Sequence, residues 1–253
     1  MEIPANSQDR MRSILLLVAT VATIIFNGLA ATGRVNGVTP EVISDKYPTV
    51  LTPAGYAFTI WSLIYVGMIA FSIYQMLQRN LVRFRSVRSL YVISCALNCS
   101  WIYFWHREQI AVCFGLIFAL LVTLIVIVIQ LSRDHDKSGA VFTKGAFGLY
   151  AGWVTAATLV NFALMLKYLN VELSSGAWAA LGAIFLMVAA AMSAFMRALF
   201  KNYIYPLAVA WAATAIAVKQ SGNTVIIVAA AICVIICLVA SVSFVMDQKS
   251  STT

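Results

Sequence analysis

Three apolar stretches of the chain each carry aromatic rings or carboxamides at spacings of three and four residues. Such spacings place these side chains on one face of a helix. The residues are Phe58, Trp61 and Tyr65 in the first stretch, Asn98, Trp101 and Trp105 in the second, and Trp153, Ala157 and Asn161 in the third. Two interpretations are open. In the first, the rings anchor helices at a membrane interface and Asn side chains hydrogen-bond neighbouring helices. In the second, rings and amides together line a cavity for a small molecule. The anchor interpretation suits Trp105 well, because it stands beside His106 at the end of its stretch.

The composition indicates what surrounds these stretches. Of the 253 residues, 62% are hydrophobic and 10% are charged, and the mean hydropathy is +0.91. A soluble domain carries about 25% charged residues, so this chain lacks the polar groups to cover a surface in water. Several apolar runs approach the roughly 20 residues that cross a bilayer as a helix. We therefore predict an all-α fold, a polytopic transmembrane helical bundle in which each backbone amide is satisfied within its own helix.

We expect about eight membrane-spanning helices. Their expected ranges are 13–31, 56–77, 90–105, 110–131, 141–166, 176–196, 203–218 and 224–246. The third and seventh ranges hold only 16 residues each, so a tilted or re-entrant segment is the alternative for both.

Basic residues gather on one side of the expected bundle. That side holds Arg10, Arg12, Arg79, Arg83, Arg85, Arg88, Arg133, Lys137, Lys144, Arg197, Lys201 and Lys249, and the other side holds Arg34, Lys46, Arg107, Lys167 and Lys219. Because basic loops remain in the cytoplasm, we expect both termini to be cytoplasmic. The net charge of +8 thus indicates topology, and we expect no nucleic-acid partner.

The acidic residues and the histidines lie outside the expected spans. This holds for all nine acidic residues and for both histidines, His106 and His135. Ion-coupled transport uses ionisable groups at membrane depth, and general acid–base catalysis needs such groups beside the reacting atoms, so neither is expected. The five cysteines form no Cys/His cluster with metal-ligand spacing. We therefore expect no metal, no cofactor and no enzyme activity.

Two further features concern packing. The expected loop at 32–55 contains the Gly and Pro residues typical of turns, and it either folds over the mouth of the bundle or remains an ordinary solvated loop. Gly148 and Gly152 form a GxxxG motif that Ala156 extends, which lets a second helix approach closely. We expect that helix to belong to the same chain, with a homodimer as the alternative.

At these residues the chain resembles the translocator protein/tryptophan-rich sensory protein family (TspO/MBR). Three segments carry the resemblance in the family's order: TPAGYAFTIWSLIY from Thr52, ALNCSW from Ala96 and WVTAATLVN from Trp153. The resemblance covers roughly residues 13–168. It implies a five-helix bundle whose pocket binds tetrapyrroles and, in animal members, sterols and drug-like ligands.

The resemblance also implies a set of site residues. By this likeness Trp61, Asn98, Trp101, Trp153, Ala157 and Asn161 line or support the pocket, and Phe58 and Tyr65 from the first stripe complete the predicted ligand site. We therefore expect a receptor for a flat hydrophobic small molecule in the lipid bilayer, with a tetrapyrrole as the candidate ligand. A transporter of such a molecule and a non-catalytic structural subunit are the alternatives. Light-dependent tetrapyrrole breakdown, suggested for family members, would make the chain an enzyme, but no residue independently supports it.

The chain departs from the family pattern at several points. Phe58 and Trp61 are three residues apart where four are usual, and Cys113 stands where many members place another Trp. The sterol-associated Tyr followed by Lys or Arg is absent after the fifth helix. Three further helices are expected after the family core, so we divide the chain into a five-helix domain at 1–170 and a three-helix extension at 171–253.

Overall fold

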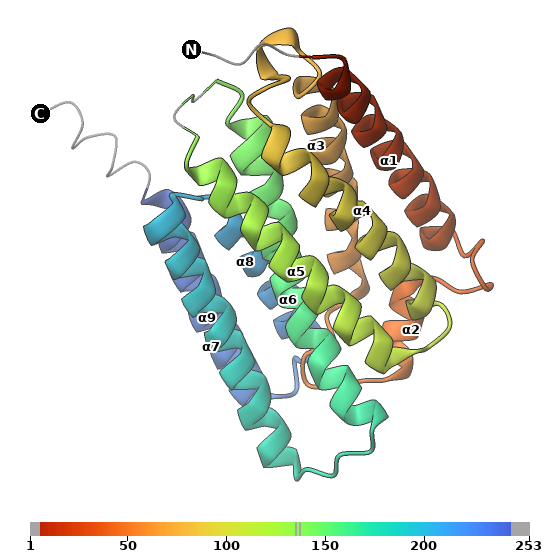
Figure 1. Cartoon of the computed structure of the whole chain (residues 1–253). Helices are drawn as coiled ribbons and strands as arrows, with labels where there is room; N and C mark the ends of the chain where they lie inside the picture. Colours follow the sequence, from red (N-terminus) through yellow and green to blue (C-terminus); the bar gives the residue numbers. More distant parts are fainter. Residues whose placement is uncertain (1–5, 135, 137, 244–253) are drawn as a thin grey trace, which may run out of the picture.

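The computed structural model describes residues 6–134, 136 and 138–243 of the chain. All regular structure in these residues is helical, and the longer helices pack side by side in a bundle (Figure 1). The helices are α1 (Ser7–Ala31), α2 (Pro40–Lys46), η1 (Gly55–Thr59), α3 (Ile60–Tyr74), η2 (Gln78–Asn80), α4 (Arg85–Trp105), α5 (Ile110–Ser132), η3 (Val141–Gly145), α6 (Ala146–Tyr168), α7 (Ser175–Phe200), α8 (Tyr205–Lys219) and α9 (Thr224–Val242). His135, Lys137, Lys249 and the end of the last expected span lie outside the described residues.

The predicted polytopic helical bundle is confirmed, and each of the eight expected spans corresponds to a helix. Six helical segments in the described part of the chain are long and apolar enough to cross a membrane. The two exceptions are α4 and α8, which are the third and seventh expected spans. Helix α4 begins with basic residues, whereas α8 has only 15 residues and is about 22 Å long at 1.5 Å per residue. The hydrocarbon core of a bilayer is roughly 30 Å thick, so α8 is short for a span.

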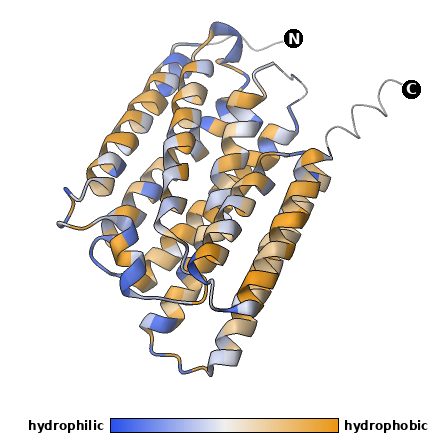
Figure 2. Ribbon diagram, turned by 180° about the vertical axis from the view of Figure 1, so that it is seen from behind, coloured by the Kyte–Doolittle hydropathy of each residue, from blue (hydrophilic) through white to orange (hydrophobic). Residues whose placement is uncertain are grey.

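The surface of the bundle agrees with a membrane location. Helices α1, α3, α5, α7 and α9 turn large apolar side chains outward, and hydrophilic residues concentrate in the loops (Figure 2). Val66 on α3 and Val239 on α9, for example, are 63% and 61% exposed. An apolar surface of this extent marks contact with lipid or with another protein. The first turn of α1 and the last turn of α9 lie at the same end of the bundle (Figure 1), as an even number of crossings requires.

The start of α1 corrects one expectation. The helix begins at Ser7 rather than at residue 13, because the Asn6 side chain caps it and exchanges hydrogen bonds with Asp9. Asp9 therefore lies inside a helix, contrary to the prediction that acidic residues lie outside the spans. Its carboxylate is buried and accepts a hydrogen bond from Arg85 Nε at 2.6 Å. This ion pair joins the first turns of α1 and α4.

Helix α8 occupies the interior of the C-terminal half and uses the GxxxG motif of α6. A Cβ atom added at Gly148 would collide with the Asn202 side chain, and one added at Gly152 would collide with the backbone oxygen of Tyr205. Asn202 also accepts hydrogen bonds from the backbone N–H of Ile204 and Tyr205 at the start of α8. The partner of the GxxxG face is thus a helix of the same chain, as expected.

We predict that Gly152→Ala destabilises the fold. The new methyl group has no room against the Tyr205 carbonyl, and overpacking of this kind costs about 1–3 kcal/mol. The measurement is the thermal unfolding midpoint of the purified protein in detergent. Gly115→Ala on α5 is the matched control, because a Cβ there meets nothing within 4 Å. Equal midpoints for the two variants would show that α6 and α8 are not in close contact.

Candidate functional site

A small cavity lies between the middle and one end of the bundle, and aromatic side chains form most of its wall. Its volume is about 40 Å³, which is room for about one water molecule. The side chains that line it are Ser44 and Pro53 from the α1–α3 loop, Phe58 and Trp61 from η1 and α3, Trp101 and Trp105 from α4, Trp153, Ala156, Ala157, Val160 and Asn161 from α6, and Ala212 and Ile216 from α8. We call this space the aromatic cavity.

The rings of the aromatic cavity contact one another mainly edge to face. Trp153 lies with its ring centroid 6.3 Å from that of Trp61 and 6.1 Å from that of Phe58, and both pairs are nearly perpendicular. Trp101 and Trp105 are stacked at 5.2 Å. Such pairs contribute roughly 0.5–1.5 kcal/mol each beyond the burial of their area. The second, third and fifth of the expected helices therefore do bring their aromatic stripes together.

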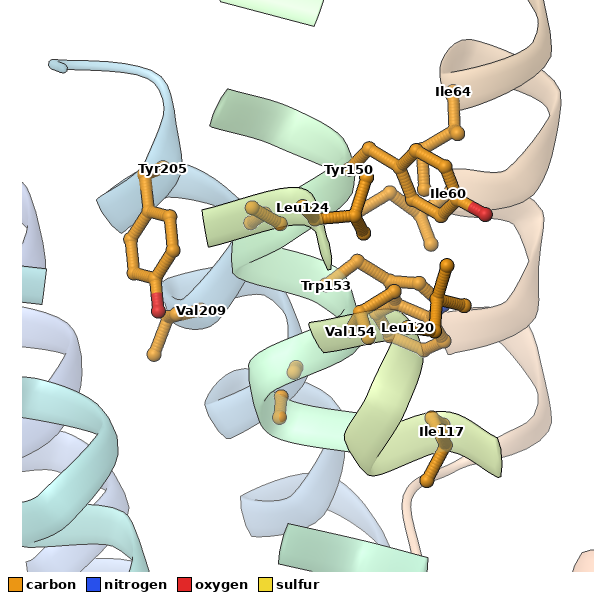
Figure 3. Close-up of a cluster of buried hydrophobic side chains, with 14 of the residues drawn as sticks. Ile60, Ile64, Ile117, Leu120, Leu124, Tyr150, Trp153, Val154, Tyr205 and Val209 are labelled. Atoms are coloured by element: carbon orange, nitrogen blue, oxygen red, sulfur yellow. The ribbon is translucent and has the colours of Figure 1, made fainter. Parts of the chain in front are cut away.

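Two nitrogen-bearing groups of the cavity differ in how their hydrogen bonds are satisfied. Both polar atoms of the Asn161 amide have partners, since its Oδ1 accepts from Trp101 Nε1 at 3.3 Å and its Nδ2 donates to the Ala157 carbonyl at 2.9 Å. The indole N–H of Trp153 is buried and has no acceptor among the described residues. A buried donor left unpaired costs about 1–3 kcal/mol. Trp153 projects from α6 towards α3 together with Tyr150 (Figure 3), so an acceptor placed between these helices would satisfy it.

Two predicted site residues do not line the aromatic cavity. Asn98 is buried and links three helices, because its Oδ1 accepts from Asn27 Nδ2 on α1 at 2.7 Å and its Nδ2 donates to the Tyr150 hydroxyl on α6 at 3.0 Å. Tyr65 stacks on Trp61 with ring centroids 5.5 Å apart, and it packs against that ring without lining the cavity. The other six predicted residues, Phe58, Trp61, Trp101, Trp153, Ala157 and Asn161, all contribute to the wall.

The structure adds wall residues that the sequence argument left out. Trp105, which suits an interfacial anchor, is instead buried at 2% exposure, and its Nε1 donates to the Pro40 carbonyl at 3.1 Å. Trp105 lies four residues after Trp101 on the same helix face, and this spacing could have predicted its place in the wall. Ala212 and Ile216 of α8 had no such signal, because small and aliphatic residues in an apolar helix look the same whether they face lipid or a cavity.

The long loop between α1 and α3 folds over the aromatic cavity and is fixed at two places. In its middle, Lys46 Nζ at the end of α2 and the hydroxyl of the following Tyr47 donate to the Glu108 carboxylate at 2.6 and 2.5 Å. Towards its C-terminal end, the Ala54 N–H donates to the Ala215 carbonyl at 3.0 Å, and Gln220 Nε2 donates to the Thr49 carbonyl at 3.0 Å. Of the two interpretations left open, the loop that covers the bundle is therefore the observed one. We call residues 40–54 the lid.

The protonation state of Glu108 changes the strength of its hydrogen bonds to the lid. The hydrogen bond from Lys46, and then that from Tyr47, lower the pKa of Glu108 below its ordinary value of 4.5, and the same bond to Glu108 raises the pKa of Tyr47 to about 12. A carboxyl group with a lowered pKa in the folded state stabilises that state at neutral pH, and the contribution is lost as pH falls through the folded pKa. The contacts of Glu108 with Lys46 and Tyr47 thus stabilise the lid at neutral pH and weaken in acid.

We predict that Glu108→Gln loosens the lid at pH 7, because an uncharged amide binds Lys46 and Tyr47 less strongly than a carboxylate. Hydrogen exchange of peptides from residues 38–54, corrected for the intrinsic rate at each pH, measures this. The wild type should exchange faster below pH 4.5, whereas the variant should be fast at both pH values. Glu172→Gln in the α6–α7 loop is the control. Equal protection of the variant and the wild type at pH 7 would contradict the role of Glu108.

These features define an integral membrane protein of the polytopic helical class, with a small aromatic cavity enclosed by its helices and a lid. The chain belongs to the family of TSPO-like proteins, whose family model matches residues 13–243. The resemblance carried by the three motifs is thereby confirmed, and the matched region includes α7, α8 and α9 as well as the first five spans. No curated protein and no solved structure matches the chain.

Proposed function

We propose that the chain is a membrane binding protein for a flat, hydrophobic small molecule, which lies between the rings of the aromatic cavity. This proposal rests on the indole N–H of Trp153, which is a buried hydrogen-bond donor without an acceptor in the described part of the chain and is surrounded by apolar side chains. Ligand sites typically combine apolar walls with a few polar groups that fix orientation. A ligand with an oxygen or nitrogen acceptor at its edge would satisfy Trp153 while its faces pack on Trp61 and Phe58.

The source of affinity is different here from that in a soluble pocket. A hydrophobic ligand in the bilayer has already left water, and lipid tails are as apolar as Leu. Burial of its surface in the cavity therefore adds little. Selectivity must come from contacts that acyl chains cannot make, namely ring-on-ring contacts at roughly 0.5–1.5 kcal/mol each and one hydrogen bond from Trp153 at about 0.5–1.5 kcal/mol. A planar aromatic ligand, such as a tetrapyrrole, gains most from these contacts.

Binding of such a ligand requires the cavity to widen. The present volume of about 40 Å³ is far below the roughly 300–1,000 Å³ of sites for small molecules. Ser44 and Pro53, which cover the cavity, belong to the lid. The lid is held by the polar contacts described above and by the buried side chains of Ile43 and Leu51. We therefore propose that the lid moves away when ligand binds, and that the described conformation is the closed one.

Trp153→Phe tests the proposed hydrogen bond, because it keeps a ring and removes the N–H. Affinity for a protoporphyrin-type probe, measured from the change in probe absorbance in detergent, should fall about five- to tenfold, and Trp153→Ala should weaken it further. Trp178→Phe, at the start of α7 and away from the cavity, is the matched control. Affinities that are the same in the wild type and in both Trp153 variants would refute binding in the aromatic cavity.

A second test concerns the wall that α8 contributes. Ile216→Phe places a larger side chain into the cavity, and we predict a loss of probe affinity of more than tenfold with the helical content retained. Ile235→Phe on α9 makes the same change at a position that is 60% exposed on the outer surface, and it should bind like the wild type. Retained affinity in the Ile216 variant would place the ligand elsewhere.

A further inference from the structure

A second hollow, larger than the aromatic cavity, lies on the outside of the bundle between α3 and α8. We call it the lateral groove. Its volume is about 620 Å³, which falls within the roughly 300–1,000 Å³ of ligand sites. Helix η3 and the start of α6 also line it, and the small residues Gly67 of α3, Gly145 of η3 and Ala146 of α6 leave room for the hollow. The groove has no part in the function proposed above.

The walls of the lateral groove are almost entirely apolar and face outward. Leu63 and Val66 on α3 are 58% and 63% exposed, and Val141 in η3 is 76% exposed. Leu207 and Trp211 of α8 complete the opposite wall, and the indole N–H of Trp211 already donates to the Ala57 carbonyl at 3.0 Å. The groove therefore offers packing and almost no hydrogen bonds, which suits a hydrocarbon chain.

Basic residues stand near one end of the lateral groove. Phe142 and Ile204 line that end, and the exposed Lys201 precedes Ile204 by three residues. Arg79 lies over the ring of Tyr74 at 6.0 Å, and that ring contacts Phe142 at 5.8 Å. In contrast, Asp134 and Asp136 at the same end are paired with Arg83. The apolar groove thus leads to basic side chains at the end of the bundle that we expect to be cytoplasmic.

We propose that the lateral groove binds an acyl chain of an anionic phospholipid, whose phosphate is attracted by the basic residues near one end of the groove, Lys201 among them. The charge at one end and the apolar length beneath it match the two parts of such a lipid. Anionic lipids concentrate in the cytoplasmic leaflet, where basic residues attract them. A second copy of the chain fits less well, because a two-fold interface pairs a surface with itself, and two concave surfaces leave a void between them.

Native mass spectrometry tests this proposal on the full-length protein, purified from nanodiscs that contain equal amounts of phosphatidylglycerol and phosphatidylcholine. The wild type should retain one phosphatidylglycerol molecule in preference to phosphatidylcholine. Ala70→Phe fills the groove and should abolish this retention. Ala194→Phe, at an exposed position on α7, is the matched control and should retain lipid like the wild type. Retention by Ala70→Phe equal to that of the wild type would overturn the proposal.

The charged end is tested separately. Lys201→Gln should reduce the preference for phosphatidylglycerol about fivefold, which corresponds to roughly 1 kcal/mol per basic residue near anionic lipid. Lys167→Gln changes a lysine at a helix C-terminus at the opposite end of the bundle and should leave the preference unchanged. Equal effects of these two variants would contradict a headgroup site at Lys201.

Two further measurements test whether the variants fold and whether the groove is an interface between copies. Circular dichroism and the unfolding midpoint establish that Ala70→Phe folds, and Val66→Trp serves as a second groove-filling variant because Val66 is already mostly exposed. The oligomeric state of each variant is read from the native mass spectra. A wild-type dimer that becomes a monomer in Ala70→Phe, with no change in bound lipid, would show that the groove is an interface between copies and would overturn the lipid site.

Discussion

The close contact between α6 and α8 is the constraint on which the rest of the structure depends. Gly148 and Gly152 present no side chain, so the Tyr205 end of α8 lies against the α6 backbone itself. In lipid this contact gains little from the hydrophobic effect and depends on van der Waals packing. Because α8 lies so near to α6, its Ala212 and Ile216 reach the aromatic cavity, and its C-terminal end binds the lid through Ala215 and Gln220. The same helix forms one wall of the lateral groove.

The C-terminal helices are therefore not an appendage to a five-helix core. The aromatic cavity takes side chains from α3, α4 and α6 on one side and from α8 on the other, and the buried hydrophobic residues form one continuous cluster from α1 to α9. The family match likewise runs from residue 13 to residue 243. The five-helix domain and three-helix extension that the sequence suggests are thus joined by one core and by one site.

Several polar groups on the helices around the aromatic cavity fix the fold, whereas the indole N–H of Trp153 does not. Asn98, Asn161 and Tyr150 are engaged with other protein groups, and they hold α1, α4 and α6 in register. In a membrane interior, where water is scarce, this is the usual reason for an amide to be present. Trp153 is different, since it sits among the same helices with its N–H unpaired. This contrast between Trp153 and its engaged neighbours, rather than the number of aromatic rings, is the basis of the proposed binding function.

The sequence by itself determined the helical class, the membrane setting, the family and the inward face of three helices. These follow from local properties: the length of apolar runs, the 3.6-residue period of the aromatic stripes, and the few motifs they contain. It predicted six of the wall residues in this way. Only the tertiary structure decided that Asn98 links helices, that Trp105 is buried, that Asp9 lies within α1, that the loop is a lid and that α8 completes the cavity. The reason is physical. Each of these features depends on which distant segment packs opposite, and the sequence around an alanine or isoleucine does not show whether that residue faces lipid or another helix.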